Sequence, residues 1–467
     1  MRSVPIALAV LVVAAARAAT ATDTALSPDQ QLARDVYAEL ININTTHSTG
    51  NTTVAAEAVA RRLKGAGFAD EDIHLLGPTP TKGGLVARLR GTGAKKPLLL
   101  LAHLDVVEAN RDDWSVDPFT LLERDGFFYG RGTLDDKAMA AIFVANLIRL
   151  RAEGFVPDRD VIVALTADEE GGPHNGVKWL LARHRELIDA DLAINEGAGG
   201  AILKGRYGAN GVQASEKIYQ SYRLEVKDRG GHSSLPVPGN AIYRLAAGLT
   251  RLAQVEFPVP ASLDDVNRAF FDRTGASIGG PLGEAMRGVA QGVRDPAVIA
   301  RVAGASPAFN ARLRTTCVPT RLDAGHADNA LPQTARAVVN CRVLPGESEA
   351  FVRQTLVTTL ADDRIEVTPA APFFPSPASP LSPDIMTAAE KVTGELWPGV
   401  PVIPSMGTGA TDSKYLRAAG IRAYGTSGIF RTVDDIREHG RDERIPVRTL
   451  YESQEYLYRL VKALASP

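Results

Sequence analysis

The stretch LLLLAHLDVV, Leu98–Val107, decides the fold. Four leucines and an alanine predict a buried strand, and His103 and Asp105 then interrupt the apolar run at its end. Two further apolar runs also end in carboxylates: Asp168, Glu169 and Glu170 after VIVALT, and Glu196 after DLAIN. Because the carboxyl ends of parallel strands meet at one edge of an open α/β sheet, we expect these side chains to line one crevice.

Around this stretch, helical patterns alternate with short apolar strands from about Ser27 onward, which predicts an α/β core. Helices are expected at 29–41, 52–64, 137–151 and 176–187, and buried strands at 85–89, 98–102, 161–166 and 192–194.

The pattern changes at about Lys217, where IYQSYRLEV alternates like a half-buried strand. Further strands are expected at 312–317, 335–343 and 365–368, and helices at 240–253 and 349–360. These antiparallel patterns predict an α+β domain over 216–368, inserted into an α/β domain made of 22–215 and 369–467. Residues 369–383 are rich in proline and read as a connector, and 264–304 are expected to add helices to the inserted domain.

The N-terminal residues 1–21 predict a signal peptide. Arg2 precedes an apolar run over 6–16, and small-x-small patterns follow it, so we expect an exported protein, periplasmic or secreted. The run is too short for a stable membrane anchor. Cys317 and Cys341 are the only cysteines, and both a disulfide and two buried thiols are compatible with their strand-like surroundings. A net charge of −2 gives no electrostatic case for a nucleic-acid partner.

The converging polar residues predict a metal site. A histidine and several carboxylates brought into one crevice would repel one another and lose hydration unless a cation neutralised them. Any one of these motifs alone is more typical of a capped turn or a helix start, but three polar ends on successive strands favour a metal. Asp135 and Asp136 precede the helix expected at 137–151, where a carboxylate can cap the helix or bridge two ions.

Together these motifs resemble the M20 family of dinuclear zinc peptidases and deacylases, which includes glutamate carboxypeptidase, aminoacylase, succinyl-diaminopimelate desuccinylase and carnosine dipeptidase. The resemblance covers nearly the whole chain after residue 21, in the family's order. It rests on His103-x-Asp105, GRGTLDDK (130–137), Asp168-Glu169-Glu170, Asn195-Glu196-Gly197, GHSSLP (231–236), DNALP (328–332), Arg342 with Pro345-Gly346, GTGATDSK (407–414) and His439. It implies a three-layer α/β zinc-peptidase domain with an inserted α+β lid and dimerisation domain.

The resemblance also implies a metal-ligand set. Asp135 would bridge two Zn²⁺ ions, with His103 and Glu196 completing one site and Glu170 and His439 the other. If the alignment slipped by one residue, the neutral Asn195 would replace Glu196 as a ligand, so Glu196 is preferred. Co²⁺ and Mn²⁺ are possible substitutes for zinc.

Further roles follow from the same resemblance. Glu169 would be the general base, Asp105 would orient the His103 imidazole, and His232 would reach across a homodimer interface as an oxyanion donor. A cis peptide bond is implied after Asp135. Substrate contacts would come from Asn329, Arg342 and Gly409, with the arginine holding a free carboxylate.

The implied activity is that of an exported dinuclear-zinc hydrolase that cleaves an amide bond next to a free carboxylate in short peptides. One alternative is an N-acyl-amino-acid deacylase. An alternative of another class is a non-catalytic binding protein that uses zinc only to stabilise the same fold; the complete set of ligands and the presence of Glu169 argue against it.

Overall fold

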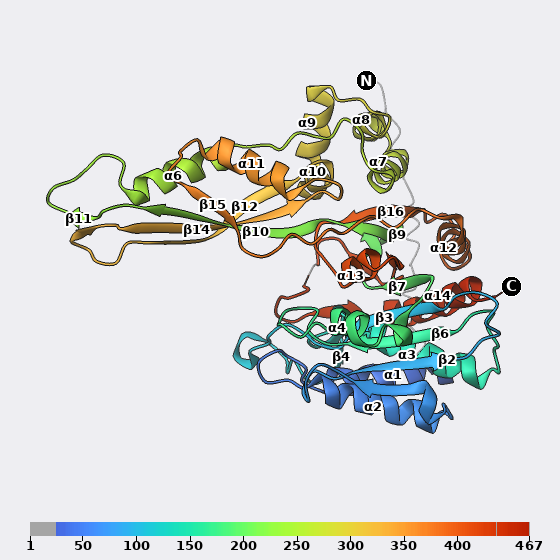
Figure 1. The fold of residues 1–467 in the computed structure, drawn as a ribbon. Helices are drawn as coiled ribbons and strands as arrows, with labels where there is room; N and C mark the ends of the chain where they lie inside the picture. Colours follow the sequence, from blue (N-terminus) through green and yellow to red (C-terminus); the bar gives the residue numbers. More distant parts are fainter. Residues whose placement is uncertain (1–24, 436, 467) are drawn as a thin grey trace, which may run out of the picture.

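The computed structural model describes residues 25–435 and 437–466, so the predicted signal peptide lies outside the described residues. The chain forms an α/β domain around a large mixed sheet, and a lid, whose strands lie between Ile218 and Pro369, projects from it (Figure 1). The predicted fold class is confirmed. Within the described part of the chain, every helix is too short or too polar to cross a lipid bilayer.

The central sheet of the α/β domain has ten strands. Their order is β1 (Ile73–Leu76), β2 (Gly84–Leu89), β6 (Val161–Thr166), β3 (Leu98–His103), β7 (Leu192–Asn195), β17 (Arg422–Gly425), β9 (Arg206–Glu216), β8 (Gly200–Leu203) and β18 (Phe430–Thr432), with β16 (Val402–Gly407) paired to β9. Strand β3 runs parallel to both β6 and β7, so their carboxyl ends lie at the same edge. All residues of these three strands are buried.

Helices cover both faces of this sheet and complete three layers (Figure 1). One layer contains α1 (Pro28–Ile41), α2 (Thr52–Gly65), α3 (Lys137–Ala152), α12 (Pro383–Leu396) and α14 (Val447–Leu464); the other contains α4 (Gly176–Arg183), α5 (Arg185–Ile188) and α13 (Ser413–Ala418). The leucines of β3 alternate between the layers: Leu98 and Leu100 pack with the first, Leu99 and Leu101 with the second. An uninterrupted apolar run is therefore required here, because both faces of the strand are buried.

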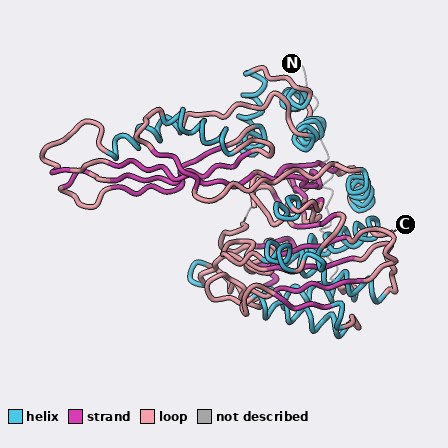
Figure 2. The backbone as a smooth tube through the Cα atoms, viewed as in Figure 1, coloured by secondary structure: helices cyan, strands magenta, loops and turns pink. Residues whose placement is uncertain are grey.

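The lid is built on a separate antiparallel sheet with the order β12 (Thr316–Ala324), β14 (Thr334–Val343), β10 (Ile218–Lys227) and β15 (Glu366–Pro369). Helices α6 (Ala241–Leu252) and α11 (Glu349–Leu360) cover one face of it, whereas no helix of residues 25–435 and 437–466 covers the face on the side of the α/β domain (Figures 1 and 2). A short pair of strands, β11 (Gly231–His232) and β13 (Ala330–Leu331), forms the far end of the lid.

The strand predicted at 312–317 is wrong at its start. Residues 307–313 form helix α10 (Pro307–Leu313), and the strand begins only at Thr316. The helix begins here because the Ser306 side chain accepts a hydrogen bond from the N–H of Ala308, and Pro307 occupies the first turn. The helices expected within 264–304 are present as α7 (Asp265–Ile278), α8 (Gly280–Ala290) and α9 (Pro296–Ala305). They were expected on the inserted domain, but they form a hydrophobic cluster with Ile403, and α7 packs on β16 of the central sheet.

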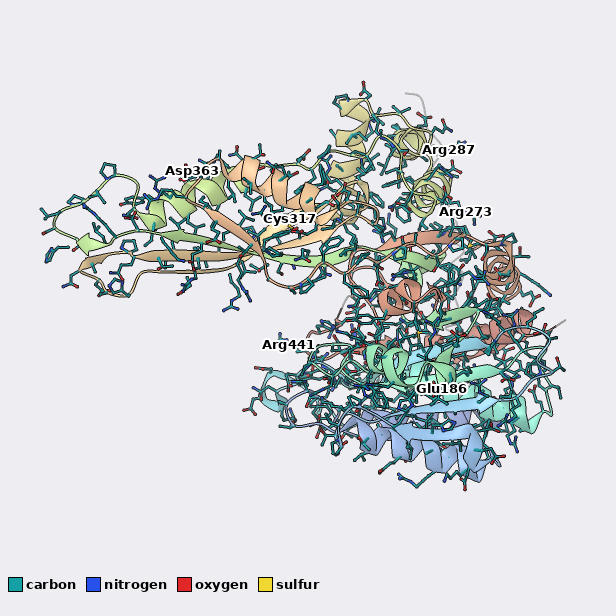
Figure 3. All side chains as sticks on the ribbon, in the orientation of Figure 1. Glu186, Arg273, Arg287, Cys317, Asp363 and Arg441 are labelled. Carbon is teal, nitrogen blue, oxygen red and sulfur yellow. A yellow bond between two sulfur atoms is a disulfide. The ribbon has the colours of Figure 1, made fainter. Side chains whose placement is uncertain are left out.

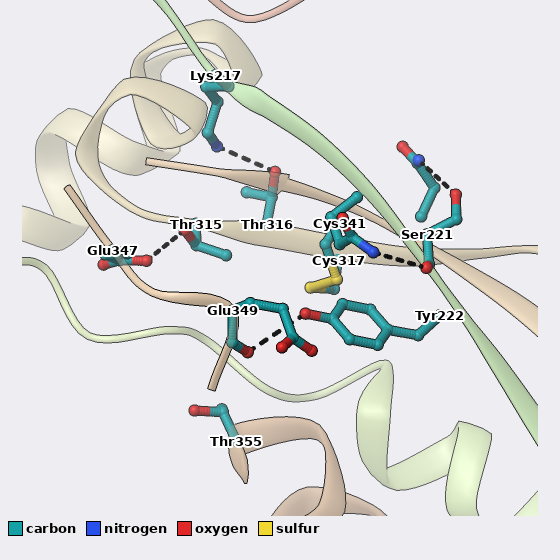
Figure 4. The surroundings of a disulfide bond; sticks show 12 residues. Lys217, Ser221, Tyr222, Thr315, Thr316, Cys317, Cys341, Glu347, Glu349 and Thr355 are labelled. Carbon is teal, nitrogen blue, oxygen red and sulfur yellow. Dashed lines mark hydrogen bonds between the residues drawn. A yellow bond between two sulfur atoms is a disulfide. The ribbon is translucent and has the colours of Figure 1, made fainter. Parts of the chain in front are cut away.

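The two cysteines form a disulfide within the lid (Figures 3 and 4). Cys317 and Cys341 lie directly opposite each other in the ladder of β12 and β14, so the register brings the two side chains together. Of the two alternatives left open by the sequence, the structure shows the disulfide.

Candidate metal centre

The carboxyl edge of the central sheet gathers the predicted ligands. His103 ends β3, Glu170 lies in the loop after β6, and Glu196 directly follows β7. Asp135 precedes α3 across a cis peptide bond with Asp136, as the resemblance implied. The potential ligand atoms of His103, Asp135 and Glu170 all lie within 4.8 Å of one another.

Asp135 lies between the two histidines. Its Oδ1 is 3.0 Å from Nε2 of His103, and its Oδ2 is 3.2 Å from Nε2 of His439. The same His439 nitrogen lies 2.9 Å from Oε2 of Glu170, and that of His103 lies 3.9 Å from Oε2 of Glu196. One oxygen of Asp135 thus faces each half of the cluster, which is the arrangement required of a bridging carboxylate.

Asp105 contacts His103 in a way that the His-x-Asp pattern did not indicate. The imidazole Nδ1 lies 2.9 Å from the main-chain oxygen of Asp105 and 3.6 Å from its carboxylate Oδ1. The carboxylate accepts hydrogen bonds from the backbone N–H groups of Glu169 (3.2 Å) and Glu170 (3.0 Å). Asp105 therefore orients the imidazole mainly through its carbonyl group and holds the Glu169–Glu170 loop with its carboxylate.

The electrostatics of the two outer carboxyl groups show unfavourable crowding of negative charge. Burial raises the pKa of Glu196 well above its usual value, and the charge of Glu169 adds to the effect. Burial likewise raises the pKa of Glu169, followed by the charge of Asp412. Since both effects disfavour the ionised carboxylate, the cluster as a protein-only site is short of positive charge.

Around Asp135 the electrostatic effect is the opposite, because the ionised carboxylate is favoured there. Burial alone would raise the pKa of Asp135, but hydrogen bonds from His103 and His439 outweigh it and hold the pKa below its usual value. Hydrogen bonds to Asp135 and Glu170 in turn raise the pKa of His439 to about 10. Protons on the two imidazoles thus occupy the places that a divalent cation would take at a metal site.

The donor set fits a pair of divalent ions. Three carboxylates and two imidazoles converge, and Oε1 of Glu170 is buried without a hydrogen-bond partner among the described residues. Imidazole nitrogen and carboxylate oxygen are ligands that Zn²⁺ binds readily, and Co²⁺ and Mn²⁺ accept them too. Glu169 is close to this set but separate from the bridge: its carboxylate lies within 4.8 Å of the ligand atoms of His103 and Glu196.

A cavity of about 90 Å³ adjoins the metal-ligand cluster and is large enough for several water molecules. Asp135 and Glu196 line one side of it, and Arg431 and Glu438 form an ion pair on its wall. Arg431 belonged to no recognised motif, and Glu438, although it directly precedes His439, was given no role, so sequence reasoning missed both.

The predicted substrate residues lie elsewhere. His232 and Asn329 are neighbours at the far end of the lid, where the N–H of Ser233 donates to the Asn329 carbonyl at 3.0 Å, and the structure does not bring them to the metal-ligand cluster within one chain (Figure 1). Arg342 lies on the uncovered face of the lid sheet. Gly409 is exposed in the loop before α13, and a Cβ added there would meet no atom within 4 Å. The fold itself therefore does not require glycine at 409.

Bridging carboxylate, flanking imidazoles and an adjacent free glutamate define the class: a dinuclear metallohydrolase. The sequence model of peptidase family M20/M25/M40 matches residues 99–463, and the chain belongs to this family. The protein is an M20-type metallopeptidase or amidohydrolase, with its candidate metal site at His103, Asp135, Glu170 and Glu196.

Comparison with known proteins agrees on the family. The chain is 30% identical over 376 residues to the N-fatty-acyl-amino acid synthase/hydrolase PM20D1 of Xenopus tropicalis, a match that covers 78% of this chain and 72% of the relative. Its fold resembles the M20 family metallo-carboxypeptidase Sso-CP2 of Sulfolobus solfataricus, with a TM-score of 0.71, 18% identity, and coverage of 94% and 99% of the two chains. It also resembles the Bacillus subtilis YXEP protein, a dinuclear metal binding peptidase, with a TM-score of 0.59, 12% identity, and coverage of 94% and 98%.

Proposed function

We propose that the protein hydrolyses an amide bond whose amine side carries a free carboxylate. The observation that carries this proposal is Arg342. Its guanidinium lies 4.8 Å from the ring centroid of Tyr219 and has no acidic partner within 4.0 Å in the described part of the chain, although burial lowers its pKa and so disfavours its charge. A substrate carboxylate would supply the missing partner through two parallel hydrogen bonds.

The surroundings of Arg342 suit a substrate better than a structural role. Thr316, Arg342 and Tyr219 form one row across β12, β14 and β10, on the face of the lid sheet opposite α6 and α11. Further along the same face of β14, Arg336 is paired with Glu225 at 2.6 Å. Of these two arginines of β14, Arg342, which has no acidic partner among the described residues, is therefore nearer to the α/β domain, and the paired Arg336 lies farther out on the lid.

The residues of the metal centre suit hydrolysis. Bound metal ions would polarise the amide carbonyl and lower the pKa of the attacking water toward about 7. Glu169 would accept the proton from that water and deliver it to the leaving amine.

The contacts of His232 leave its Nε2–H free to donate a hydrogen bond. The backbone N–H of Ser234 donates to its Nδ1 at 3.2 Å, and the Ser234 hydroxyl lies 2.7 Å from the same atom. Because a backbone N–H can only donate, Nδ1 is the acceptor in the neutral ring, and the ring proton is on Nε2. Nε2–H is then available for the oxyanion that forms as the amide is attacked.

For the substrate class, we propose N-acyl amino acids ahead of the short peptides expected from the motifs. The relative with 30% identity is named as an N-fatty-acyl-amino acid synthase/hydrolase, and the structural neighbour named as a carboxypeptidase is more distant in sequence. Both substrate classes present the same acyl–NH–CHR–COO⁻ unit to Arg342. The two substrate classes are separated by measuring turnover of an acyl-amino acid series, a Gly-X dipeptide and a longer peptide. Each substrate is compared with its C-terminal amide as a control, and faster turnover of the amides would contradict the proposal.

Export and dimerisation complete the proposal. The N-terminal signal pattern and the lid disulfide both suit an oxidising compartment outside the cytosol. The position of His232, far from its own metal centre, suits a homodimer in which each lid serves the other chain. N-terminal sequencing of the protein purified from whole cells and medium should find a start near Ala19 or Thr22, and a retained residue 1 would contradict export.

The mechanism is tested by Glu169→Gln. We expect kcat to fall by about 10²- to 10⁴-fold, since the amide cannot accept a proton, while the protein still binds two metal ions. Glu186→Gln, on the exposed surface of the α/β domain, is the matched control and should leave both unchanged (Figure 3). Unchanged turnover in Glu169→Gln would refute the role of the general base, and a protein without turnover on any substrate would favour the non-catalytic alternative.

A further inference from the structure

Glu443, a carboxylate outside the predicted ligand set, lies buried near the candidate metal site, four residues after His439. Its side chain is only 1% exposed and would be costly to bury without partners. Its two oxygens accept hydrogen bonds from the main-chain N–H groups of Leu134 (2.7 Å) and Asp135 (3.2 Å) and from Gly132 (3.1 Å) and Nη1 of Arg131 (2.7 Å). One carboxylate thus holds the whole loop that presents the bridging Asp135.

The fold places Glu443 at this loop through a small three-stranded sheet. Strand β19 (Arg444–Pro446) pairs with β5 (Phe127–Tyr129), which pairs with β4 (Leu122–Arg124). Just beyond the β19–β5 ladder, the N–H of Gly130 donates to the main-chain oxygen of Glu443 at 3.1 Å. The segment that carries His439 and the loop that carries Asp135 are therefore held side by side by backbone hydrogen bonds that need no metal ion.

Arg131 closes the connection from the other side. Its Nη1 binds Glu443, while its Nη2 donates to the main-chain oxygen of Gly440 at 2.9 Å, one residue after His439. The guanidinium also lies over the ring of Trp114, 4.9 Å from its centroid. His439 itself has a left-handed backbone with φ of 59°, a conformation that a non-glycine residue keeps only when its surroundings hold it.

We propose that Glu443 and Arg131 are positioning residues that set the separation of Asp135 and His439, and thereby the affinity of the metal site formed by Asp135, Glu170 and His439. The inference rests on the metal-ligand assignment of the proposed function. It goes further by predicting an unequal effect: the site that contains His439 depends on the Glu443–Arg131 pair more than the site formed by His103 and Glu196, because His103 is held by β3 and Asp105.

The variant Glu443→Gln tests the geometry closely. Both carboxylate oxygens receive only donors, so wherever the glutamine NH₂ lies it meets an N–H group, and Arg131 loses its counter-charge. We expect the ion held by Asp135, Glu170 and His439, called the second ion below, to bind about 10- to 100-fold more weakly. The ion held by His103 and Glu196, the first ion, should change much less. A zinc titration of apo-protein against a competing chelator measures both affinities. The matched control is Asp160→Asn. Asp160 likewise accepts from an arginine, Arg88 (2.7 Å), and from a backbone N–H, that of Gly91 (2.8 Å), at the opposite edge of the sheet.

The outcomes are distinguishable. If wild-type protein binds fewer than two ions at saturation, the metal-ligand assignment fails. If wild type binds two and Glu443→Gln binds both with unchanged affinity, or if Asp160→Asn weakens the second ion equally, the positioning role is overturned. Should Glu443→Gln not fold, Arg131→Lys keeps the charge but loses the fork that joins Glu443 to Gly440, and the same selective weakening of the second ion is expected; equal affinities there would also overturn the proposal.

Discussion

At the scale of single residues, Arg342 separates a substrate role from a structural one. Arg342→Lys keeps the positive charge and removes the planar fork, so we expect KM to rise by about 10- to 100-fold for substrates with a free carboxylate, with kcat little changed. The C-terminal amide of the same substrate should be hydrolysed equally by variant and wild type. Steady-state kinetics on the acid and amide pair measure both.

The control for this prediction lies on the same strand. Arg336→Lys changes the same side chain on the same face of β14, but Arg336 is already paired with Glu225. An equal rise in KM in Arg336→Lys would attribute the effect to the general charge of the lid and not to a bound carboxylate.

The strand ends and the helix start indicated His103, Asp135, Glu169, Glu170 and Glu196 as candidates, because each follows an apolar strand or precedes a helix. His439 lies in the loop between β18 and β19 and was named only because of the resemblance to the M20 family. Glu443 and the carboxylate role of Asp105 were not predicted. Their partners are main-chain N–H groups far away in the chain, such as Asp135 for Glu443, and no side-chain pattern records such contacts.

At the scale of elements, the apolar strands were predictable because burial on both faces requires continuous hydrophobic sequence, as in Leu98–Ala102. The start of the lid edge strand was not. Arg312–Cys317 has an alternating pattern, yet the Ser306–Pro307 cap starts a helix that carries the chain to Leu313. Local capping here outweighs a short alternating pattern, because such a pattern specifies a strand and its register only weakly.

The junction between β9 and β10 contains a buried lysine that titrates unusually. Nζ of Lys217 donates to the Arg314 carbonyl (2.7 Å) and to the Thr316 hydroxyl (3.2 Å), and burial lowers its pKa from 10.5 to about 7. Between about pH 7 and 10.5 the unfolded chain therefore binds a proton that the folded chain does not, so this group makes stability rise with pH across that window.

The variant Lys217→Met removes this titration. The loss of its hydrogen bonds costs the same at every pH, whereas the pH-dependent contribution disappears, so wild type should gain a few kcal/mol over the variant between pH 7 and 10. Urea unfolding at several pH values measures the difference, with the exposed Lys391→Met as the control. Parallel stability curves for wild type and Lys217→Met would contradict a neutral lysine at this junction.

At the scale of the whole molecule, the lid presents its functional residues in two places. Arg342 is the next-to-last residue of β14, which ends at Val343 near the α/β domain, while His232 lies at the far end of the lid beside β13 (Figure 1). One chain therefore does not bring the proposed oxyanion donor to its own metal centre in this structure. A homodimer resolves this separation if the lid of each chain reaches the site of its partner.

Such a dimer predicts complementation between two inactive variants. Homodimers of His232→Ala lack the oxyanion donor at both sites, and homodimers of Glu169→Gln lack the base at both. In a mixed dimer, the His232→Ala chain supplies Glu169 to a site that receives an intact His232 from its partner, so one site of the two is complete. Statistical mixing should restore about one quarter of wild-type activity, because about half of the dimers are mixed. Co-expression with two different affinity tags isolates the mixed dimer for assay. Activity no greater than the sum of the separate variants would mean that each chain uses its own His232, and that the lid must close onto its own domain instead.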